Sequence, residues 1–339
     1  MRRQIEIIGG GLAGLSLGIA LRNAGVPVAI FEAGRYPRHR VCGEFINGLA
    51  PATIRALGIE EVFGDAVLNR DVAWLRAGRP TRFQRLRTPA LGLSRHALDE
   101  RLADLFVELG GELHVDQRIG DTAGEAAGRV LTFGRRRART SWIGLKLHAL
   151  DFPLLRDLEV HLGDCAYVGA ARVENGRVNL CGFFQRRSVG GRGSQIMLAY
   201  LRAAGLDELA SRLRSAEVDE ASFSAVAALQ CDRVVRTTPE LRLGDACAMI
   251  PPFTGNGMAM AFQSAECALE PLVAFARGAV SWSATRQSVQ RSLRQRFRVR
   301  LAAAHLMHPF ILQPGFQAVL ALMNRARLVP LTSLHRVLH

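Results

Sequence analysis

Near the N-terminus, short apolar runs alternate with glycine-rich turns. Residues 4–8 are apolar enough for a buried strand, residues 12–23 show the mostly apolar pattern of a helix that stops at Gly25, and residues 26–31 form a second strand-like run. The pattern predicts a strand–helix–strand unit at the start of the chain.

The hydrophobic period changes further along the chain. A helix is predicted where apolar residues recur three and four apart, at Leu98, Leu102, Leu105, Phe106 and Leu109, before Gly110-Gly111 ends it. After Trp142 the runs become short and strand-like, at 142–147, 159–162, 166–171 and 177–182, with Gly, Asp and Asn-Gly turns between them. Asn175-Gly176 predicts a tight hairpin between the last two runs.

The C-terminal part is expected to be helical. In residues 286–308, Val289, Leu293, Phe297 and Leu301 recur every four residues, and arginines occupy the other faces. We favour a helix that packs this stripe on the domain, with contact to an anionic membrane surface as the alternative. Residues 316–323 predict another helix, and a short one follows Pro330. His305 and His308 lack a carboxylate or cysteine partner in the pattern, so no metal site is expected.

The composition is that of a globular protein of about two domains. The chain has 339 residues, of which 49% are hydrophobic and 22% charged. No apolar run reaches the ~18 residues of a membrane span. Residues 1–3 lead directly into a strand, which leaves no room for a signal peptide. The six scattered cysteines suggest reduced thiols, so we expect a cytoplasmic protein, peripheral to a membrane only if the basic helix binds one.

The net charge of +14 raises the question of an anionic partner. Lys146 is the only lysine, and such an arginine bias fits a GC-rich genome as readily as phosphate binding. Aromatic residues make up only 6% of the chain, and no nucleic-acid-binding motif is present. A nucleic-acid partner is therefore not expected, and an anionic substrate, carrier or membrane is favoured.

The glycines at Gly9, Gly11 and Gly14 carry the first chemical prediction. They stand between the first strand and helix, where a dinucleotide motif has one glycine for the turn, one for close approach of the pyrophosphate and one for helix packing. The free N–H groups at the helix start would bind the phosphates. Glu32, at the end of the second strand, can bind ribose hydroxyls.

A second glycine-rich block stands late in the chain. Asp245 follows the short strand-like run 241–243 and is suited to a sugar-type hydroxyl. Gly255-Asn256-Gly257 then begins an apolar helix whose free N–H groups would stabilise negative charge. Together the two blocks predict FAD as the cofactor.

With residues 38–45 and 93–99, these blocks resemble the FAD-dependent oxidoreductases of the aromatic-hydroxylase (p-hydroxybenzoate hydroxylase-like) and geranylgeranyl-reductase superfamily. The resemblance covers roughly residues 1–275. It implies an α/β (α+β) fold, with a Rossmann-like FAD/NAD(P)-binding domain, an inserted antiparallel β-sheet substrate domain and a helical C-terminal tail. The cofactor-binding residues that the motifs and the resemblance indicate are Gly9, Gly11, Leu12, Ala13, Gly14, Glu32, Ala33, Arg40, Val41, Cys42, Gly43, Arg95, Gly244, Asp245, Pro252, Gly255, Asn256, Gly257 and Met258.

We expect three regions. Residues 1–70, 92–135 and 236–275 form a discontinuous FAD-binding domain, residues 71–91 and 136–235 form the substrate domain, and residues 276–339 form the helical tail. The substrate is expected to be a hydrophobic small molecule in a pocket lined by Phe83, Trp142, Tyr167, Phe183 and Phe184, each of which could equally be a core residue.

Two catalytic candidates lie in one segment. The resemblance implies that Cys42 lies close to the flavin, although free cysteine is also a common small core residue. Glu44 could be a general acid if burial raises its pKa. The chain departs from its relatives at residues 132–137, where no Asp-Gly pair is present and residues 119–129 look shortened. That departure weakens a mechanism in which this segment binds nicotinamide.

The reaction that we favour is monooxygenation of an aromatic or polyketide-like ring. The resemblance implies that NAD(P)H reduces the flavin and that a C4a-peroxyflavin hydroxylates the ring. The Cys-Gly-Glu segment supports the alternative, reduction of C=C bonds in a prenyl or lipid chain. A distant alternative is a flavin-fold protein that binds a ligand without turnover.

Overall fold

A five-stranded parallel sheet forms one half of the molecule. The computed structural model describes residues 2–120, 126–135 and 138–325. The strand order is β13–β7–β1–β2–β6, with β1 at Ile5–Ile8, β2 at Val28–Phe31, β6 at Glu112–His114, β7 at Arg129–Leu131 and β13 at Leu241–Arg242. All the pairings are parallel, so the carboxyl ends of these strands meet at one edge.

Helices bury this sheet. Helix α1 (Leu12–Asn23) follows β1 and is apolar on nearly all sides, because it packs in a single core with α3 (Arg95–Glu108) and α6 (Gly257–Ala276). The predicted strand–helix–strand unit and the helix after residue 95 are confirmed. Three short elements, α2 (Pro51–Leu57), η1 (Glu61–Phe63) and β3 (Phe45–Ile46), lie in the connection after β2.

The second half is an eight-stranded sheet in the order β12–β8–β11–β10–β9–β4–β5–β3. Its remaining strands are β4 (Val67–Arg76), β5 (Arg79–Gly92), β8 (Trp142–Leu150), β9 (Leu158–Gly163), β10 (Ala166–Arg172), β11 (Val178–Gln185) and β12 (Glu217–Ala227). The sheet is antiparallel except where β4 pairs with β9 in parallel. The predicted hairpin joins β10 to β11, and positive φ at both Asn175 and Gly176 gives the tight turn.

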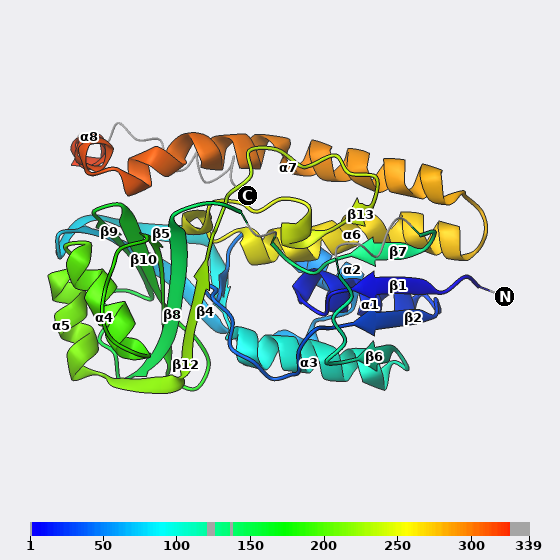
Figure 1. Ribbon diagram of the computed structural model, residues 1–339, viewed down its shortest axis with the longest axis horizontal. Coiled ribbons are helices and arrows are strands. Elements are labelled where there is room, and N and C mark those ends of the chain that lie inside the picture. Colours follow the sequence, from blue (N-terminus) through cyan, green and yellow to red (C-terminus); the bar gives the residue numbers. More distant parts are fainter. Residues whose placement is uncertain (1, 121–125, 136–137, 326–339) are drawn as a thin grey trace.

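The two faces of the large sheet have different neighbours. Helices α4 (Ser194–Ala203) and α5 (Asp207–Ser215) cover one face with a separate apolar core (Figure 1). The other face looks toward the carboxyl edge of the parallel sheet. Because side chains alternate along a strand, consecutive residues of β8, β10 and β11 belong to different environments.

The long helix α7 (Trp282–Leu312) runs past both halves of the molecule and is followed by α8 (Pro314–Arg325) (Figure 1). Its stripe of Val289, Leu293, Phe297 and Leu301 is fully buried in the core with α6. The expected packing of this stripe is therefore confirmed, and those side chains are not free to enter a membrane. No described helix has both the length and the apolar character to cross one. The helix expected after Pro330 lies outside the described residues.

Candidate functional site

A cavity of about 840 Å³ joins the two halves of the molecule. The residues at the carboxyl ends of four parallel strands line it, namely Ile8 and Gly9 after β1, Phe31 and Glu32 at β2, Thr132 after β7 and Gly244 after β13. Open α/β sheets bind ligands at this edge. The opposite wall is the inner face of the large sheet.

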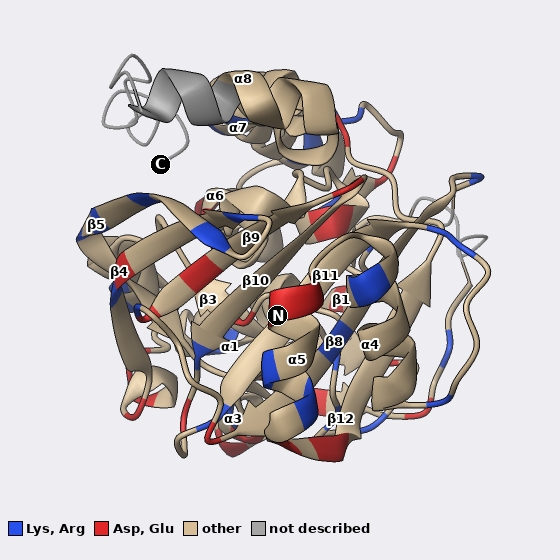
Figure 2. Ribbon diagram, turned by 90° about the vertical axis from the view of Figure 1, so that its left-hand side faces the viewer, with Lys and Arg blue, Asp and Glu red and all other residues tan. Residues whose placement is uncertain are grey.

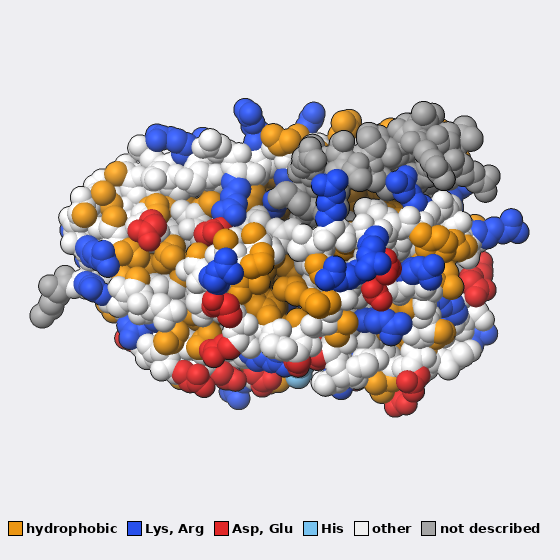
Figure 3. Space-filling view, turned by 180° about the vertical axis from the view of Figure 1, so that it is seen from behind, with side chains coloured by type: hydrophobic (Ala, Val, Ile, Leu, Met, Phe, Trp, Pro, Cys, Tyr) orange, Lys and Arg blue, Asp and Glu red, His pale blue; other side chains and the backbone are white. Residues whose placement is uncertain are grey.

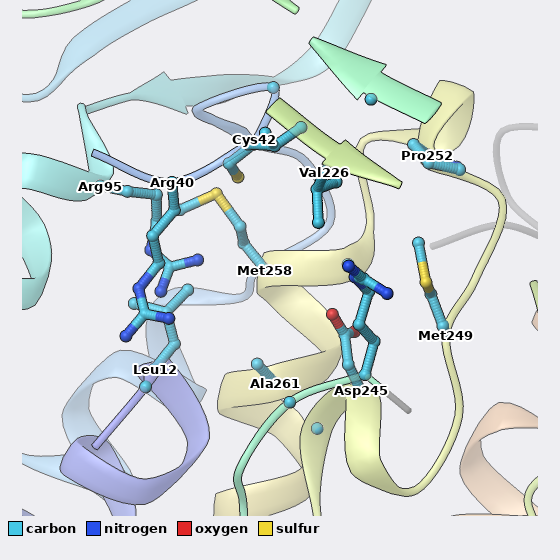
Figure 4. A pocket seen from close by; sticks show the side chains of 18 of the residues that line it. Leu12, Arg40, Cys42, Arg95, Val226, Asp245, Met249, Pro252, Met258 and Ala261 are labelled. Atoms are coloured by element: carbon cyan, nitrogen blue, oxygen red, sulfur yellow. The ribbon is translucent and has the colours of Figure 1, made fainter. Parts of the chain in front are cut away.

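Most of the residues predicted to bind the cofactor line this one cavity. They are Gly9, Gly11, Leu12, Ala13, Glu32, Ala33, Arg40, Val41, Cys42, Gly43, Arg95, Gly244, Asp245, Pro252, Gly255, Gly257 and Met258. Gly14 and Asn256 lie behind it. Figure 4 shows Arg40 and Arg95 on one side of the cavity beside Leu12, with Asp245, Met249 and Pro252 on the other. Segments from both ends of the chain thus meet at one site.

The glycine motif has the close contacts that a dinucleotide site requires. A Cβ at Gly9 would lie 2.5 Å from the backbone nitrogen of Phe133, and one at Gly14 would collide with the carbonyl of Gly9. Gly11 is different, because a Cβ there would meet no atom within 4 Å. Gly11 is also the N-cap of α1, so the open space lies at the positive end of that helix.

Glu32 is buried and holds the turn that it faces. Its carboxylate accepts hydrogen bonds from the N–H of Gly10 (2.7 Å) and of Gly34 (3.1 Å). Arg38 forms an ion pair with it at 2.6 Å. Glu32 therefore fixes the glycine turn and also presents its carboxylate to the cavity.

Arg40 and Arg95 share one carboxylate. Asp99 is fully buried and accepts two bonds from Arg95, at 2.7 and 2.8 Å, and one from Nε of Arg40 at 2.9 Å. Two guanidinium groups on one carboxylate leave a net positive charge at the wall beside α1. Nη2 of Arg40 is buried without a hydrogen-bond partner in the described chain. The pair is suited to a phosphate group.

The sequence reasoning assigned Asp99 no role. Its spacing of four residues from Arg95 on a predicted helix is the signal that could have identified the pair.

Asp245 is the middle residue of the short helix η2 (Gly244–Ala246), and its carboxylate points into the cavity (Figure 4). Burial raises its pKa to about 6; Arg95 and Arg135 lower the pKa, whereas Asp232 raises it. Nearby, η3 (Pro252–Thr254) leads into α6, whose N-cap Asn256 is fully buried with no partner for its amide atoms among the described residues. Of these two side chains, Asp245 lines the cavity and is available to a polar ligand.

Aromatic side chains gather on the large-sheet wall. Tyr167 and Phe183 line the cavity, and their rings stack at 5.6 Å between centroids. Trp142 stacks on Phe183 at 4.9 Å, outside the lining itself. Phe253 and Met249, which the sequence reasoning missed, complete this apolar end. Figure 3 shows hydrophobic side chains gathered near the middle of one face of the molecule, with charged side chains around them.

Besides Trp142, two other predicted lining residues, Phe184 and Phe83, do not line the cavity. Phe184 is buried in the core under α4, because it is the neighbour of Phe183 and points to the other face of β11. Phe83 on β5 is 52% exposed and packs against the guanidinium of Arg156. Phe184 lies outside the cavity because side chains alternate along a strand. Phe83 lies outside it because β5 is near the edge of the sheet.

Cys42 lines the cavity as a protonated thiol. Burial raises its pKa, and Arg95, whose positive charge lowers the pKa, only partly opposes this. Asn179 donates a hydrogen bond to the carbonyl of Cys42 at 3.0 Å and fixes the segment against the large sheet. A proton donor is thus present at this wall, and a thiolate is not.

The expectation that Glu44 is a general acid is wrong. Its side chain is fully buried behind the cavity, where burial by itself would raise the pKa. The hydrogen bond to His148 and the charge of Lys146 outweigh burial and hold the pKa below its usual value. Glu44 is therefore a carboxylate with fixed partners. The sequence did not identify Lys146 and His148 as those partners.

No metal site is formed in the part of the chain that the structure describes, where no three potential metal ligands come together. Figure 2 shows basic and acidic positions interspersed on the elements seen from that side. The cavity is therefore our candidate for the functional site.

Comparison with known proteins supports the same conclusion about the fold. Residues 7–43 match the model of a NAD(P)-binding Rossmann-like domain. No curated protein sequence matches the chain.

Among solved structures, HpxO of Klebsiella pneumoniae, complexed with FAD and uric acid, superposes with a TM-score of 0.74 at 15% identity, over 99% of this chain and 95% of that one. The p-nitrophenol 4-monooxygenase PnpA of Pseudomonas putida DLL-E4 gives 0.75 at 16% identity, over 99% and 97%. PqsL of Pseudomonas aeruginosa, in complex with 2-aminobenzoylacetate, gives 0.69 at 16% identity, over 94% and 99%.

The chain has the fold of the FAD-dependent aromatic hydroxylases and monooxygenases, with a Rossmann-like nucleotide-binding domain. The resemblance inferred from the four sequence blocks is confirmed at the level of the fold.

Proposed function

We propose that this protein is an FAD-dependent monooxygenase that hydroxylates a hydrophobic aromatic or polyketide-like small molecule, with NAD(P)H as the electron donor. The observation that carries the proposal is the single cavity that connects the glycine motif to the aromatic wall of the large sheet. A two-part molecule such as FAD, with a substrate beside its ring, suits that shape. Structural neighbours that bind uric acid or 2-aminobenzoylacetate support a small aromatic substrate.

The residues present fit FAD. The open space at Gly11 and the first N–H groups of α1 would hold the pyrophosphate. Beside it would lie Nη2 of Arg40, which has no hydrogen bond in the described chain and a 3.9 Å ion-pair contact with Glu32. Asp245 would accept a hydrogen bond from a ribityl hydroxyl. When bound, FAD supplies hydride acceptance and oxygen activation.

The polypeptide contributes binding and electrostatics. Gly257 and Met258 bring the first turn of α6 to the cavity, where the helix dipole would stabilise negative charge on the reduced ring. The aromatic pair Tyr167 and Phe183 would orient a planar substrate by stacking and exclude water. No residue at the wall has to act as a strong base, because a phenol activates its own ring.

The test is incorporation of labelled oxygen. The purified protein is saturated with FAD, supplied with NADH or NADPH under ¹⁸O₂, and tested on a panel of phenols, anilines and purines. The proposal expects substrate-stimulated oxidation of the nicotinamide and one ¹⁸O atom in the product. Absence of FAD binding would contradict this and the reductase proposal alike, and would leave the non-catalytic binding protein.

A C=C reductase is the second candidate, and Cys42 favours it. The thiol is protonated and faces the cavity in the segment that resembles the reductases. This function would give reduced alkene under anaerobic conditions with a chemically reduced flavin. Replacement of Cys42 by Ala would then lower the rate of alkene reduction, and an unchanged rate would contradict a role for the thiol.

A further inference from the structure

Lys146 occupies an unusual position for a lysine. It is the only lysine in a strongly arginine-rich sequence, and its side chain is fully buried. It lies on β8 two residues after Gly144, so both face the cavity side of the large sheet. Lysine is rarely buried without partners, so its contacts identify its role.

The ammonium group of Lys146 lies between two groups of the segment 39–44. Nζ is 3.2 Å from Oε1 of Glu44 and 3.1 Å from Nδ1 of His39. Glu44 is fixed in turn, because it also accepts the N–H of Arg95 at 3.0 Å and contacts Nε2 of His148. Lys146 is therefore held in a rigid position against the ring of His39.

This contact determines where the proton of His39 resides. An ammonium group has donors and no acceptor, so Nδ1 of His39 must accept. The ring proton is then on Nε2, which makes no hydrogen bond within the described chain. His39 itself lines the cavity.

His39 is also kept neutral. Burial and the neighbouring Lys146, His96 and His148 lower its pKa to about 4, and Glu44 opposes them. The ring of His96 on α3 lies tilted against it at 4.5 Å between centroids, and His148 on β8 meets it edge-on at 5.3 Å. These groups, from every element packed on His39, favour an uncharged ring at neutral pH.

We propose that His39 is a neutral hydrogen-bond donor to a carbonyl oxygen or an anionic oxygen of a ligand bound in the cavity, and that Lys146 is the positioning residue that fixes its tautomer. The inference rests on the proposed function, since it assigns one contact of the same site. A neutral N–H can stabilise charge that develops on a ligand oxygen and does not itself titrate near pH 7. The acceptor belongs either to the flavin or to the substrate.

The tautomer is measured directly, without activity and without FAD. The full-length protein is labelled with ¹⁵N-histidine, and long-range ¹H–¹⁵N spectra identify which ring nitrogen carries the proton. Replacement of His39 by Gln assigns its signals. We expect a neutral ring protonated on Nε2 at pH 7, with a titration midpoint near 4. A proton on Nδ1, or a doubly protonated ring, would overturn the proposal.

Variants separate positioning from folding. In Lys146→Met the tautomer preference should be lost, and the midpoint of His39 should move from about 4 toward its ordinary 6.5. If the uncompensated Glu44 prevents folding, Glu44→Gln/Lys146→Met removes both charges. It should give the same loss of tautomer preference with a smaller rise of the midpoint, because Glu44 itself raises the pKa of His39. His96→Gln is the control, since it removes the neighbouring imidazole ring and keeps the contact between Nδ1 of His39 and Nζ of Lys146. An unchanged tautomer and midpoint in a folded Lys146 variant would show that Lys146 has no positioning role.

Addition of FAD alone then identifies the acceptor. A change in the Nε2 signal at saturation assigns it to the flavin. A signal that changes only when p-nitrophenol is added to the FAD complex assigns it to the aromatic ligand. Failure of FAD to bind would contradict the proposed function and leave the tautomer result intact, so the two can fail separately.

Discussion

At the scale of single residues, the missing side chain of Gly11 leaves the start of α1 open to the cavity. We expect Gly11→Ala to fold with unchanged stability, because its backbone is extended and a Cβ there meets no protein atom within 4 Å. The added methyl group would occupy the space of the pyrophosphate, so the affinity for FAD should fall at least about tenfold, or 1.4 kcal/mol. Fluorescence titration with FAD and thermal melting of the free protein measure the two effects.

Gly190→Ala is the matched control, since its Cβ also meets no atom within 4 Å and the residue lies in an exposed loop. The Gly190→Ala variant should keep the FAD affinity and the melting temperature of the parent protein. Equal FAD affinity in the Gly11→Ala variant would place the cofactor elsewhere.

Gly169 likewise leaves open space in the cavity, at the wall formed by the large sheet. It lines the cavity on β10, and the nearest atom to an added Cβ is the carbonyl of Cys181 at 3.9 Å. Gly169→Leu should therefore fill cavity space and lower kcat/KM for two-ring substrates about tenfold relative to one-ring substrates. Gly169→Ala should give a smaller change in the same direction. A uniform loss for all substrates would instead indicate a disturbed sheet.

At the scale of elements, α7 contributes stability through its apolar stripe. Phe297 is 1% exposed in the core with α6, so Phe297→Ala should lower the free energy of unfolding by about 3–5 kcal/mol. Val299, 54% exposed on the same helix, provides the control, and Val299→Ala should stay within about 0.5 kcal/mol of the parent. Denaturant unfolding compares the two. If the two variants lowered the free energy of unfolding equally, α7 would not pack as described.

The far end of α7 makes stability depend on pH. His308 stacks on Phe253 and lies tilted against Phe183. Burial and the charge of His305 lower its pKa to about 4. Below its ordinary pKa of 6.5 the unfolded chain binds a proton that the folded protein does not. The free energy of unfolding should therefore fall as the pH drops from 6.5 toward 4.

His308→Gln should lose less stability over that interval than the parent protein. His114→Gln, on a half-exposed ring stacked on Phe31, should behave like the parent. Melting temperatures at a series of pH values check both. Identical pH profiles for all three proteins would contradict a role for His308.

At the scale of the whole molecule, the ligand site is shared between two sheets. FAD bound there would contact both halves, so FAD should raise the melting temperature of the whole protein in one transition. At a free FAD concentration 100 times the Kd, the free energy of unfolding should rise by about 2.7 kcal/mol. AMP, which can reach only the glycine-motif end, should give a smaller gain at equal concentration. Equal gains would mean that the aromatic end takes no part in binding.

The parts of the fold that the sequence predicted are those that depend on local order. The glycine turn, α1, α3 and the β10–β11 hairpin follow from residues near one another in the chain, as does the stripe of α7. The spacing of apolar residues along a helix or strand shows which side of the element is buried, even when the element that covers it is unknown. The division into domains and the roles of the site residues stay predictions.

Other features were decided only when distant segments came together. Period two shows that Phe183 and Phe184 face opposite ways, and only the packing of α4 shows which of them reaches the cavity. Glu44 is an ion because β8 places Lys146 and His148 against it. Burial, pairing and charge at such a residue depend on partners about a hundred positions away, and no local pattern in the chain encodes those distances. The sequence by itself thus determined the glycine turn and the main elements, because these depend on residues near one another in the chain. Tertiary packing decided the burial, charge pairing and orientation of the side chains around the cavity, because their partners lie far away in the sequence.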